Sequence, residues 1–319
     1  MRADRSAVGR VATEVRPGSV VERVDTVDAG NRRRTAVVRL TDADPIVVQV
    51  GTDPAAARVE ARLRRAIAER TSVPVPTPLG AGTVDGEGWL ATPHVAGDSL
   101  HESFTRLDPP GRRRVTRSFG RSLAALHDAF RFDTYGPLML VEGELAVDTG
   151  GNGGAGTEWA AWFTAFGRAA LDRLPSEFDG IRTDVADALA AFDAESTPGS
   201  RLFPWDLRPG NALLSDGRLT AILDWERPFS AAPALSVAKT EYLVADWYVP
   251  GAETESLREA FRAGYESVRA YPHVRPGHRV AAVVNAAVDS RGAVTNPGYP
   301  PVSRSDAVRF HRRNLERLL

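Results

Sequence analysis

The sequence predicts an α+β protein with two lobes, a small β-rich first lobe and a larger, mainly helical second lobe. Short runs of β-branched residues separated by turn residues fill residues 19–50, which is typical of strands. From residue 115 onward, apolar residues recur at helical spacing instead. A chain of 319 residues is long enough for two lobes. We place them at residues 1–95 and 96–319.

The first lobe is predicted to be an antiparallel meander followed by a helix. Its strands are expected in "SVVERV", "RTAVVRL" and "PIVVQV", the last two joined by the turn residues "TDAD". A helix should follow over residues 53–70, with Asp53 as N-cap and Pro54 at the first helical position. The prolines of "TSVPVPTPLGAG" end it. A strand pair in "TVDGEGWLATPHV" and a linker, "AGDS", complete the lobe.

The second lobe is predicted from two helical faces and one apolar hairpin. Each face repeats apolar residues at helical spacing, and the two sets are Val115, Phe119, Leu123, Leu126, Phe130 and Trp159, Phe163, Phe166, Ala170, Leu174. Between them lies the glycine-rich stretch "TGGNGGAG" at residues 149–156. It lacks the GK[ST] ending of a phosphate-binding loop, which favours a flexible surface connection.

Composition narrows the class of protein. The chain contains no cysteine, which excludes disulfides, thiolate nucleophiles and zinc–thiolate sites and fits a reducing compartment. No stretch resembles a secretory signal or approaches a membrane span. With a net charge of −1, the chain has no overall positive charge that would attract nucleic acid. We therefore expect a cytoplasmic protein that binds neither nucleic acid nor membrane; the sequence does not predict its oligomeric state.

The stretch "FPWDLRPGNALL" at residues 203–214 carries the chemistry. "NALL" and "LTAIL", joined by "SDGR", form an apolar hairpin. Folding this hairpin brings Asn211 at its entry beside Asp224 at its exit, and one carboxylate with one carboxamide suits Mg²⁺. Asp206 can then accept a proton from a hydroxyl nucleophile, and Arg208 can grip a phosphate oxygen. Taken singly, Asp206 and Asn211 are better explained as turn caps and Asp224 as a strand-end acid. Their joint spacing around one hairpin favours a site instead, and the alternative for Arg208 is a solvated cation.

The chain resembles the aminoglycoside phosphotransferase-like kinases, which are relatives of the protein kinases. The resemblance rests on Asp206-Leu207-Arg208-Pro209-Gly210-Asn211 followed by Ile222-Leu223-Asp224-Trp225-Glu226, and it covers roughly residues 20 to 270. It implies a bilobal protein-kinase-like fold with Asp206 as catalytic base and Asn211 and Asp224 as Mg²⁺ ligands.

The resemblance also implies a nucleotide site in the first lobe. Glu60 would be the acid on the small-lobe helix, and Gly30 and Asn31 would lie in the loop over the phosphates. The hinge would be Thr92-Pro93-His94-Val95, where the Pro93 carbonyl and the Val95 amide would pair with adenine.

Supporting positions depart from the family pattern. Gln49 stands where the family has a basic residue, so we expect Glu60 to lack its ion-pair partner. Pro204 replaces the usual histidine before the catalytic aspartate, and Ala232 and Ser236 replace two further family residues. The arginines of "GNRRRTAVV", at positions 32–34, either form a solvated hairpin tip or supply the missing charge. His127 is expected to be a packed, hydrogen-bonded histidine.

The expected function is Mg²⁺-dependent transfer of the γ-phosphoryl group of ATP or GTP to a hydroxyl of a small molecule. The acceptor should lie near the helices at residues 157–193 and near "TEYLVADWYV", where Glu241 and Asp246 either meet a cationic acceptor or are structural. The alternative is a catalytically silent nucleotide-binding or scaffolding protein of the same fold. Gln49, Pro204, Ala232 and Ser236 favour that alternative, and Asp206, Asn211 and Asp224 oppose it.

Overall fold

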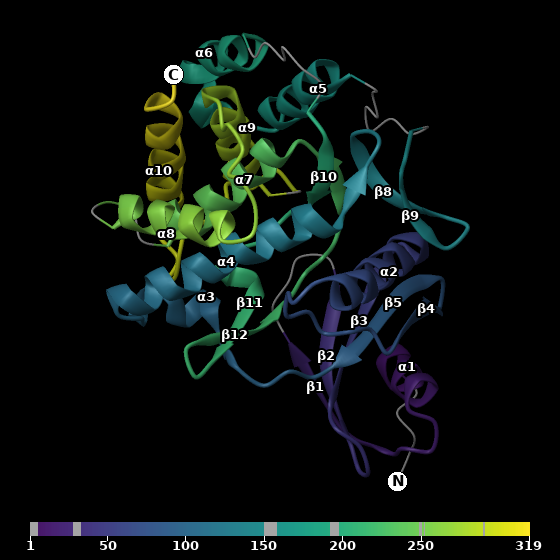
Figure 1. The fold of residues 1–319 in the computed structure, drawn as a ribbon. Coiled ribbons are helices and arrows are strands. Elements are labelled where there is room, and N and C mark those ends of the chain that lie inside the picture. Colours follow the sequence, from purple (N-terminus) through teal and green to yellow (C-terminus); the bar gives the residue numbers. More distant parts are fainter. Residues whose placement is uncertain are drawn as a thin grey trace.

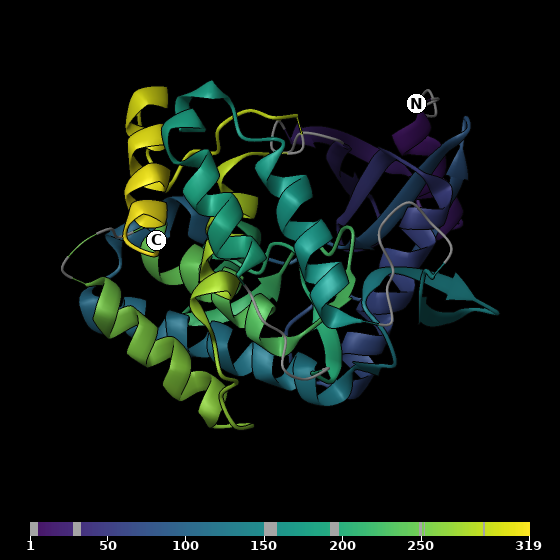
Figure 2. The ribbon, with the colours of Figure 1, turned by 90° about the horizontal axis from the view of Figure 1, so that it is seen from above.

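A computed structural model gives the protein an α+β fold with a β-rich and a helical region. The residues it describes are 6–27, 33–149, 158–191, 198–248, 251, 253–289 and 291–319. Gly30, Asn31 and most of the glycine-rich stretch lie outside them. Figure 1 shows the purple and blue strands of the first lobe at one end of the molecule and the green and yellow helices at the other. In both Figure 1 and Figure 2, α1 and α10 lie at opposite ends.

The first lobe is built on one antiparallel sheet with the strand order β1-β2-β3-β5-β4. Its strands are β1 (Val21–Val27), β2 (Arg34–Leu40), β3 (Ile46–Thr52), β4 (Gly80–Val84) and β5 (Glu87–Pro93). Alternate residues of β3, Ile46, Val48 and Val50, are fully buried, and they share a small core with α1 (Ala7–Val15). Because side chains alternate along a strand, Gln49 lies on the sheet face opposite α1.

Helix α2 (Pro54–Arg70) begins where the sequence predicts it. Asp53 caps it by accepting the Ala56 N–H at 2.9 Å, and Pro54 occupies the first helical position. Its apolar face, which includes Leu63 and Ile67, belongs to the large core of the second lobe and not to the small core under α1. The helix is thereby packed against the helical lobe, with Glu60 buried on it.

The second lobe surrounds the large core with helices. They are α3 (Leu100–Ser103), α4 (Pro109–Ala129), α5 (Trp159–Leu171), α6 (Asp179–Ala190), α7 (Pro233–Glu241), α8 (Thr254–Glu266), α9 (Pro276–Ala287) and α10 (Arg304–Glu316). A π-helix, η4 (Tyr242–Asp246), continues α7, and short 3₁₀ turns are η1 (Phe104–Arg106), η2 (Ser176–Phe178) and η3 (Pro209–Asn211).

Two small antiparallel sheets lie among these helices. One has the order β7-β10-β13-β8-β9, from strands β7 (Arg131–Phe132), β8 (Gly136–Val141), β9 (Glu144–Val147), β10 (Ser200–Phe203) and β13 (Phe229–Ala231). The other has the order β12-β11-β6, from β6 (Asp98–Ser99), β11 (Ala212–Ser215) and β12 (Arg218–Ile222). The second sheet contains the predicted apolar hairpin. Among the described residues, no helix is both long and apolar enough to cross a bilayer.

Helices α4 and α8 cross at two glycines. A Cβ added to Gly120 would lie 2.0 Å from the Phe261 carbonyl oxygen, and one added to Gly264 would lie 2.0 Å from the Arg117 carbonyl oxygen. The two helix backbones therefore touch directly, an approach that any larger residue prevents.

Candidate active site

The hairpin of β11 and β12 brings Asn211 and Asp224 to the same end of one small sheet. Ala212 lies opposite Ile222, so the residues just outside the hairpin, Asn211 and Leu223, face each other. The Leu223 N–H donates to the Asn211 carbonyl at 2.7 Å, which extends the pairing to the residue before Asp224. The spacing predicted from the sequence thus places both candidate metal ligands together.

Asp206 lies on the loop between β10 and η3, and Asn211 holds this loop. The Asn211 Nδ2 donates to the Asp206 carbonyl oxygen at 2.9 Å. This bond uses the amino group of the carboxamide and leaves its oxygen for a cation. Gly210 lets the loop pass close to Tyr248, because a Cβ there would lie 2.7 Å from the Tyr248 hydroxyl oxygen. The Asp206 side chain remains 33% exposed.

Asp224 is the most perturbed acid of the site. Its φ of 58° lies in the left-handed region, which aspartate adopts more readily than most residues other than glycine. Asp224 is exposed to solvent on one side, and the protein on its other side together with the charges of Glu226, Asp206 and Glu60 raises its pKa to about 6, while Arg33 opposes this rise. A cation bound beside Asp224 would favour its charged form and lower this pKa.

The donor set fits Mg²⁺ held jointly with a phosphorylated ligand. Asn211 and Asp224 lie at the same end of the hairpin and bring one carboxamide and one carboxylate to it. Within the ranges that the structure describes, there is no group of three or more His, Cys, Asp or Glu side chains that would hold a metal alone. Magnesium retains water readily and commonly takes phosphate oxygens alongside one or two protein ligands, so two protein donors are sufficient.

Arg33 corrects two expectations about the nucleotide side. It is not part of a solvated hairpin tip, because its side chain is only 5% exposed, and it lies 2.7 Å from both Glu60 and Glu226. Glu60, expected to lack a partner because Gln49 replaces the strand cation, is also paired with Arg64 on its own helix. The four side chains form a chain of ion pairs from α2 to the segment just after Asp224. These carboxylates raise the pKa of Arg33 although burial opposes the rise.

The other predicted nucleotide residues lie around the sheet and the hinge. Gln49 pairs with Thr35 of β2 and with Leu90 of β5 across the ladder. At the hinge, the His94 N–H donates to the Pro45 carbonyl at 2.9 Å. Because successive carbonyls of an antiparallel strand alternate in direction, the Pro93 carbonyl points away from β3. Pro93 and Val95 are both partly exposed.

Arg208 lies on the same loop as Asp206, with its guanidinium 5.3 Å from the centre of the Trp247 ring. A cation over an aromatic face is a stable arrangement that still leaves N–H groups for other partners.

Lys239 is a site residue that the sequence analysis did not assign. Its side chain is 3% exposed, and its Nζ lies 3.8 Å from Asp206 Oδ1 and 3.6 Å from the centre of the Trp205 ring. The only signal in the sequence was its uniqueness, since the chain has no other lysine. His127 is a buried, hydrogen-bonded residue as predicted, with Nδ1 at 2.7 Å from the Tyr265 hydroxyl and Nε2 at 2.6 Å from Ser236 Oγ.

Glu241 and Asp246 do not offer an acidic surface to an acceptor. Both are buried, Glu241 against Arg279 and the Tyr271 hydroxyl, and Asp246 against Arg258 at 2.9 Å. Of the two interpretations of these acids, the structure supports the structural one.

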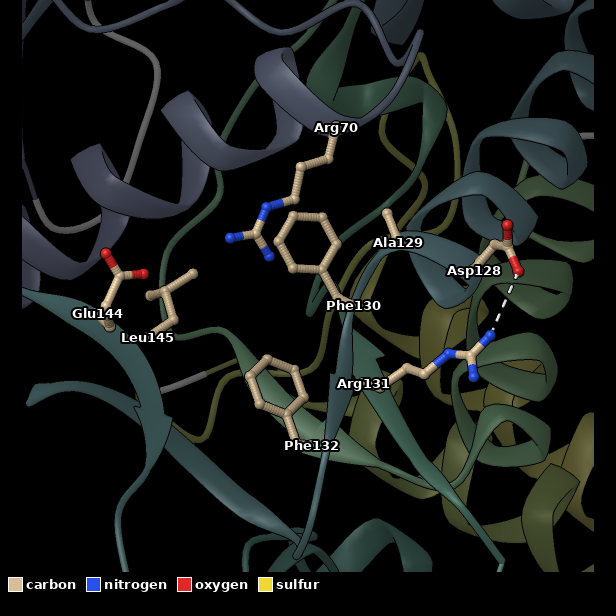
Figure 3. A pocket seen from close by; sticks show the side chains of 8 residues that line it. All are labelled: Arg70, Asp128, Ala129, Phe130, Arg131, Phe132, Glu144 and Leu145. Atoms are coloured by element: carbon tan, nitrogen blue, oxygen red, sulfur yellow. Dashed lines mark ion pairs between the residues drawn. The ribbon is translucent and has the colours of Figure 1, made fainter.

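Two cavities lie apart from Asp206, Asn211 and Asp224. One, of about 270 Å³, lies between the end of α2, the end of α4 and β9; Figure 3 shows the side chains that line it, Arg70, Asp128, Ala129, Phe130, Arg131, Phe132, Glu144 and Leu145. The other, of about 250 Å³, is lined by Ala238, Tyr242, Asp246, Arg258, Arg279, Val283, Asn314, Arg317 and Leu318. Neither cavity is lined by Asp206, Asn211 or Asp224.

Comparisons with known proteins bear on the family and the fold of the chain. A family model described as the phosphotransferase enzyme family matches residues 24–276. Aminoglycoside phosphotransferase APH(4)-Ia is 14% identical, with 98% of this chain and 97% of that chain covered and a TM-score of 0.69. A thermostable mutant of that enzyme, in a ternary complex with AMP-PNP and hygromycin B, is 15% identical, with 98% of both chains covered and a TM-score of 0.69.

A provisionally assigned fructosamine-3-kinase from Haemophilus somnus 129PT is 15% identical, with 97% of this chain and 96% of that chain covered and a TM-score of 0.62. At these identities the likeness shows the fold, which is the bilobal protein-kinase-like fold that the sequence predicts. No curated protein matches the chain.

Proposed function

The chain belongs to the phosphotransferase enzyme family, and on that premise we propose that it transfers the γ-phosphoryl group of ATP or GTP to a hydroxyl group of a small molecule, with Mg²⁺. The observation that carries this proposal is the grouping of Asp206, Asn211 and Asp224 on one loop and hairpin. An acid beside two oxygen donors is the arrangement that in-line transfer to a hydroxyl requires.

In the proposed reaction the acceptor hydroxyl lies against Asp206. Its oxygen forms a bond to the γ-phosphorus while the bond from that phosphorus to the bridging oxygen of the β-phosphate breaks, and the hydroxyl proton passes to the Asp206 carboxylate. The products are a phosphorylated acceptor and a nucleoside diphosphate. When bound to Asn211 and Asp224, Mg²⁺ would neutralise phosphate charge. Arg208 would take an oxygen of the transferred group.

The nucleotide would lie between the lobes. We assign its adenine or guanine to the Pro93 carbonyl and the Val95 amide, and its α and β phosphates to Arg33, which Glu60 holds in place. Gln49 would donate hydrogen bonds to the same phosphates without adding charge. Gly30 and Asn31 remain proposals for the loop over the phosphates, outside the described residues.

The acceptor is proposed to bind against the second lobe, on the Asp206 side of α5 and α6. Because Glu241 and Asp246 are already neutralised by Arg279 and Arg258, they give no reason to favour a polycationic acceptor. The acceptor panel should therefore extend beyond aminoglycosides to sugars and amino alcohols, with hygromycin B and a fructosamine included because relatives of this fold bear those names.

The test is nucleotide turnover by the purified protein with Mg²⁺ against that panel. We expect acceptor-dependent formation of diphosphate and a phosphorylated product, and we expect Asp206→Asn to abolish most of it while nucleotide binding persists. A ligand at 100 times its dissociation constant stabilises a fold by about 2.7 kcal/mol, so binding is followed by thermal melts. Melts that shift without any turnover would favour the catalytically silent alternative. Melts that do not shift at millimolar nucleotide would contradict both.

A further inference from the structure

Lys239 stands out because the chain buries its only lysine directly beneath the catalytic loop. The side chain extends from α7 and its ammonium faces the Trp205 ring at 3.6 Å and the Phe203 ring at 5.8 Å. The same ammonium lies 3.8 Å from Asp206 Oδ1. A buried ammonium requires compensation, and an aromatic face together with a carboxylate provides it.

Neighbouring residues do not replace Lys239 as the partner of Asp206. Ser236, one turn before Lys239 on α7, bonds His127 Nε2 at 2.6 Å. Pro204 has no polar side chain, and the Arg208 guanidinium lies over Trp247. Among the described residues, Lys239 is the one cation within 4.0 Å of the Asp206 carboxylate.

We propose that Lys239 is the positioning residue of the proposed catalytic base: its ammonium, held on the Trp205 ring, fixes the Asp206 carboxylate so that the second oxygen is free for the acceptor hydroxyl. This inference rests on the proposed function for its catalytic consequence, but the pairing itself is a property of the folded protein. Trp205 acts as the platform, and its own position is set by Phe229 at 5.4 Å between ring centres.

The charge on Lys239 is conditional on pH. Burial lowers its pKa to about 8, with Arg208, Arg173 and Arg227 acting in the same direction and Asp206 opposing them. The ammonium is therefore charged at neutral pH and loses its proton as the pH rises through about 8. Above that pH the pairing with Asp206 is lost, and we expect kcat/KM for the acceptor to fall with it.

The pairing can be measured without any catalysis. Protein grown with ¹³C-labelled lysine has a single side-chain signal, because Lys239 is the only lysine. We expect this signal to titrate near pH 8 in the wild-type protein and at lower pH in Asp206→Asn, which removes the group that favours the charged form. Equal midpoints in the two proteins, or a midpoint above pH 10 in the wild type, would overturn the proposal.

The positioning role is measured by kinetics. Lys239→Met keeps the length and loses the charge, and we expect it to lower kcat about tenfold or more while the KM for nucleotide changes less than about twofold. Lys239→Arg should retain most of kcat and shift the fall at high pH upward, because a guanidinium does not deprotonate in this range. Ser236→Ala, on the same helix, is the matched control and should leave the pH profile unchanged.

The outcomes separate the two proposals. If the wild-type protein shows no turnover, the phosphotransferase proposal fails, and the lysine titration still decides the pairing. If turnover is present and Lys239→Met retains wild-type kcat with an unchanged pH profile, the positioning role is wrong. Should Lys239→Met not fold, the Arg variant and the titration of Asp206→Asn decide the question.

Discussion

Arg33 is the residue whose removal tests the nucleotide site most directly. At 2.7 Å and an effective dielectric constant near 20, each of its pairs with Glu60 and Glu226 attracts by about 6 kcal/mol before desolvation. Most of that attraction is offset by the cost of burial, and breaking a buried pair typically costs about 3–5 kcal/mol net. Glu60 keeps Arg64 and Glu226 is partly exposed, so we expect Arg33→Met to destabilise the fold by about 2–3 kcal/mol.

Two assays follow Arg33→Met. For a chain of this size about 1 kcal/mol corresponds to about 2 °C in Tm, so the variant should melt about 4–6 °C lower. Calorimetric titration with ATP and Mg²⁺ should show at least about a tenfold weaker Kd, which corresponds to about 1.4 kcal/mol of lost phosphate attraction. Arg34→Met is the matched control: Arg34 is 62% exposed and pairs with Glu87 at the surface, so both quantities should change little.

A second substitution tests whether Arg33 replaces the basic residue that the family has at position 49. If Arg33 supplies the charge that Gln49 lacks, Gln49→Lys should change little in the wild type and should recover part of the nucleotide affinity in the Arg33→Met background. The reasoning is refuted if Arg33→Met melts and binds ATP as the wild type does. It is also refuted if Gln49→Lys tightens binding equally in both backgrounds, because the two cations would then act independently.

Three further predictions concern the metal, the core and pH. Asp224→Asn should abolish the extra Tm rise that Mg²⁺ adds to nucleotide, with the nucleotide-only shift retained. Gly120→Ala should lower Tm by several degrees because its Cβ meets a backbone carbonyl at 2.0 Å, whereas Gly180→Ala, with nothing nearer than 3.7 Å, should be neutral or stabilising. Burial lowers the pKa of His278 and of His311 to about 4. The folded protein then binds fewer protons than the unfolded chain, so the free energy of unfolding should fall by about 1.4 kcal/mol per pH unit for each histidine as the pH drops from about 6.5 toward 4. Urea unfolding at pH 7.5, 6 and 5 checks this, and His311→Gln should remove part of the slope.

Local signals in the sequence predicted the elements that carry the site. The cap and proline at Asp53 and Pro54 fixed the start of α2, and the Asp-Gly turn of "SDGR" located the hairpin that joins Asn211 to Asp224. Helix caps and tight turns depend on residues that are adjacent in the chain, so they can be predicted from the sequence. The roles assigned to Asn211, Asp224 and the other site residues remain proposals.

Residues whose partners come from distant segments were harder to predict. Nothing near Arg33 in the sequence indicates that Glu60 and Glu226 will pair with it. The three residues come from separate segments of the chain that only the fold brings together. The residues around Lys239 in the sequence indicate only a helix. The packing of α7 against Trp205 is what places its ammonium beside Asp206. Helix α1 and the β8–β9 hairpin were also not predicted, because short elements at the edge of a lobe owe their stability to tertiary contacts rather than to propensity.

The crossing of α4 and α8 at Gly120 and Gly264 has a mechanical consequence. With each backbone seated against a carbonyl of the other helix, neither helix can slide along its partner without a steric clash, so shear between them is blocked. We therefore expect α4 and α8 to move together as one rigid unit. Any opening or closing around a substrate must be taken up by backbone rotation elsewhere, and the exposed connection at residues 94–97, which ends in a glycine at φ 152°, is where the chain passes between the lobes.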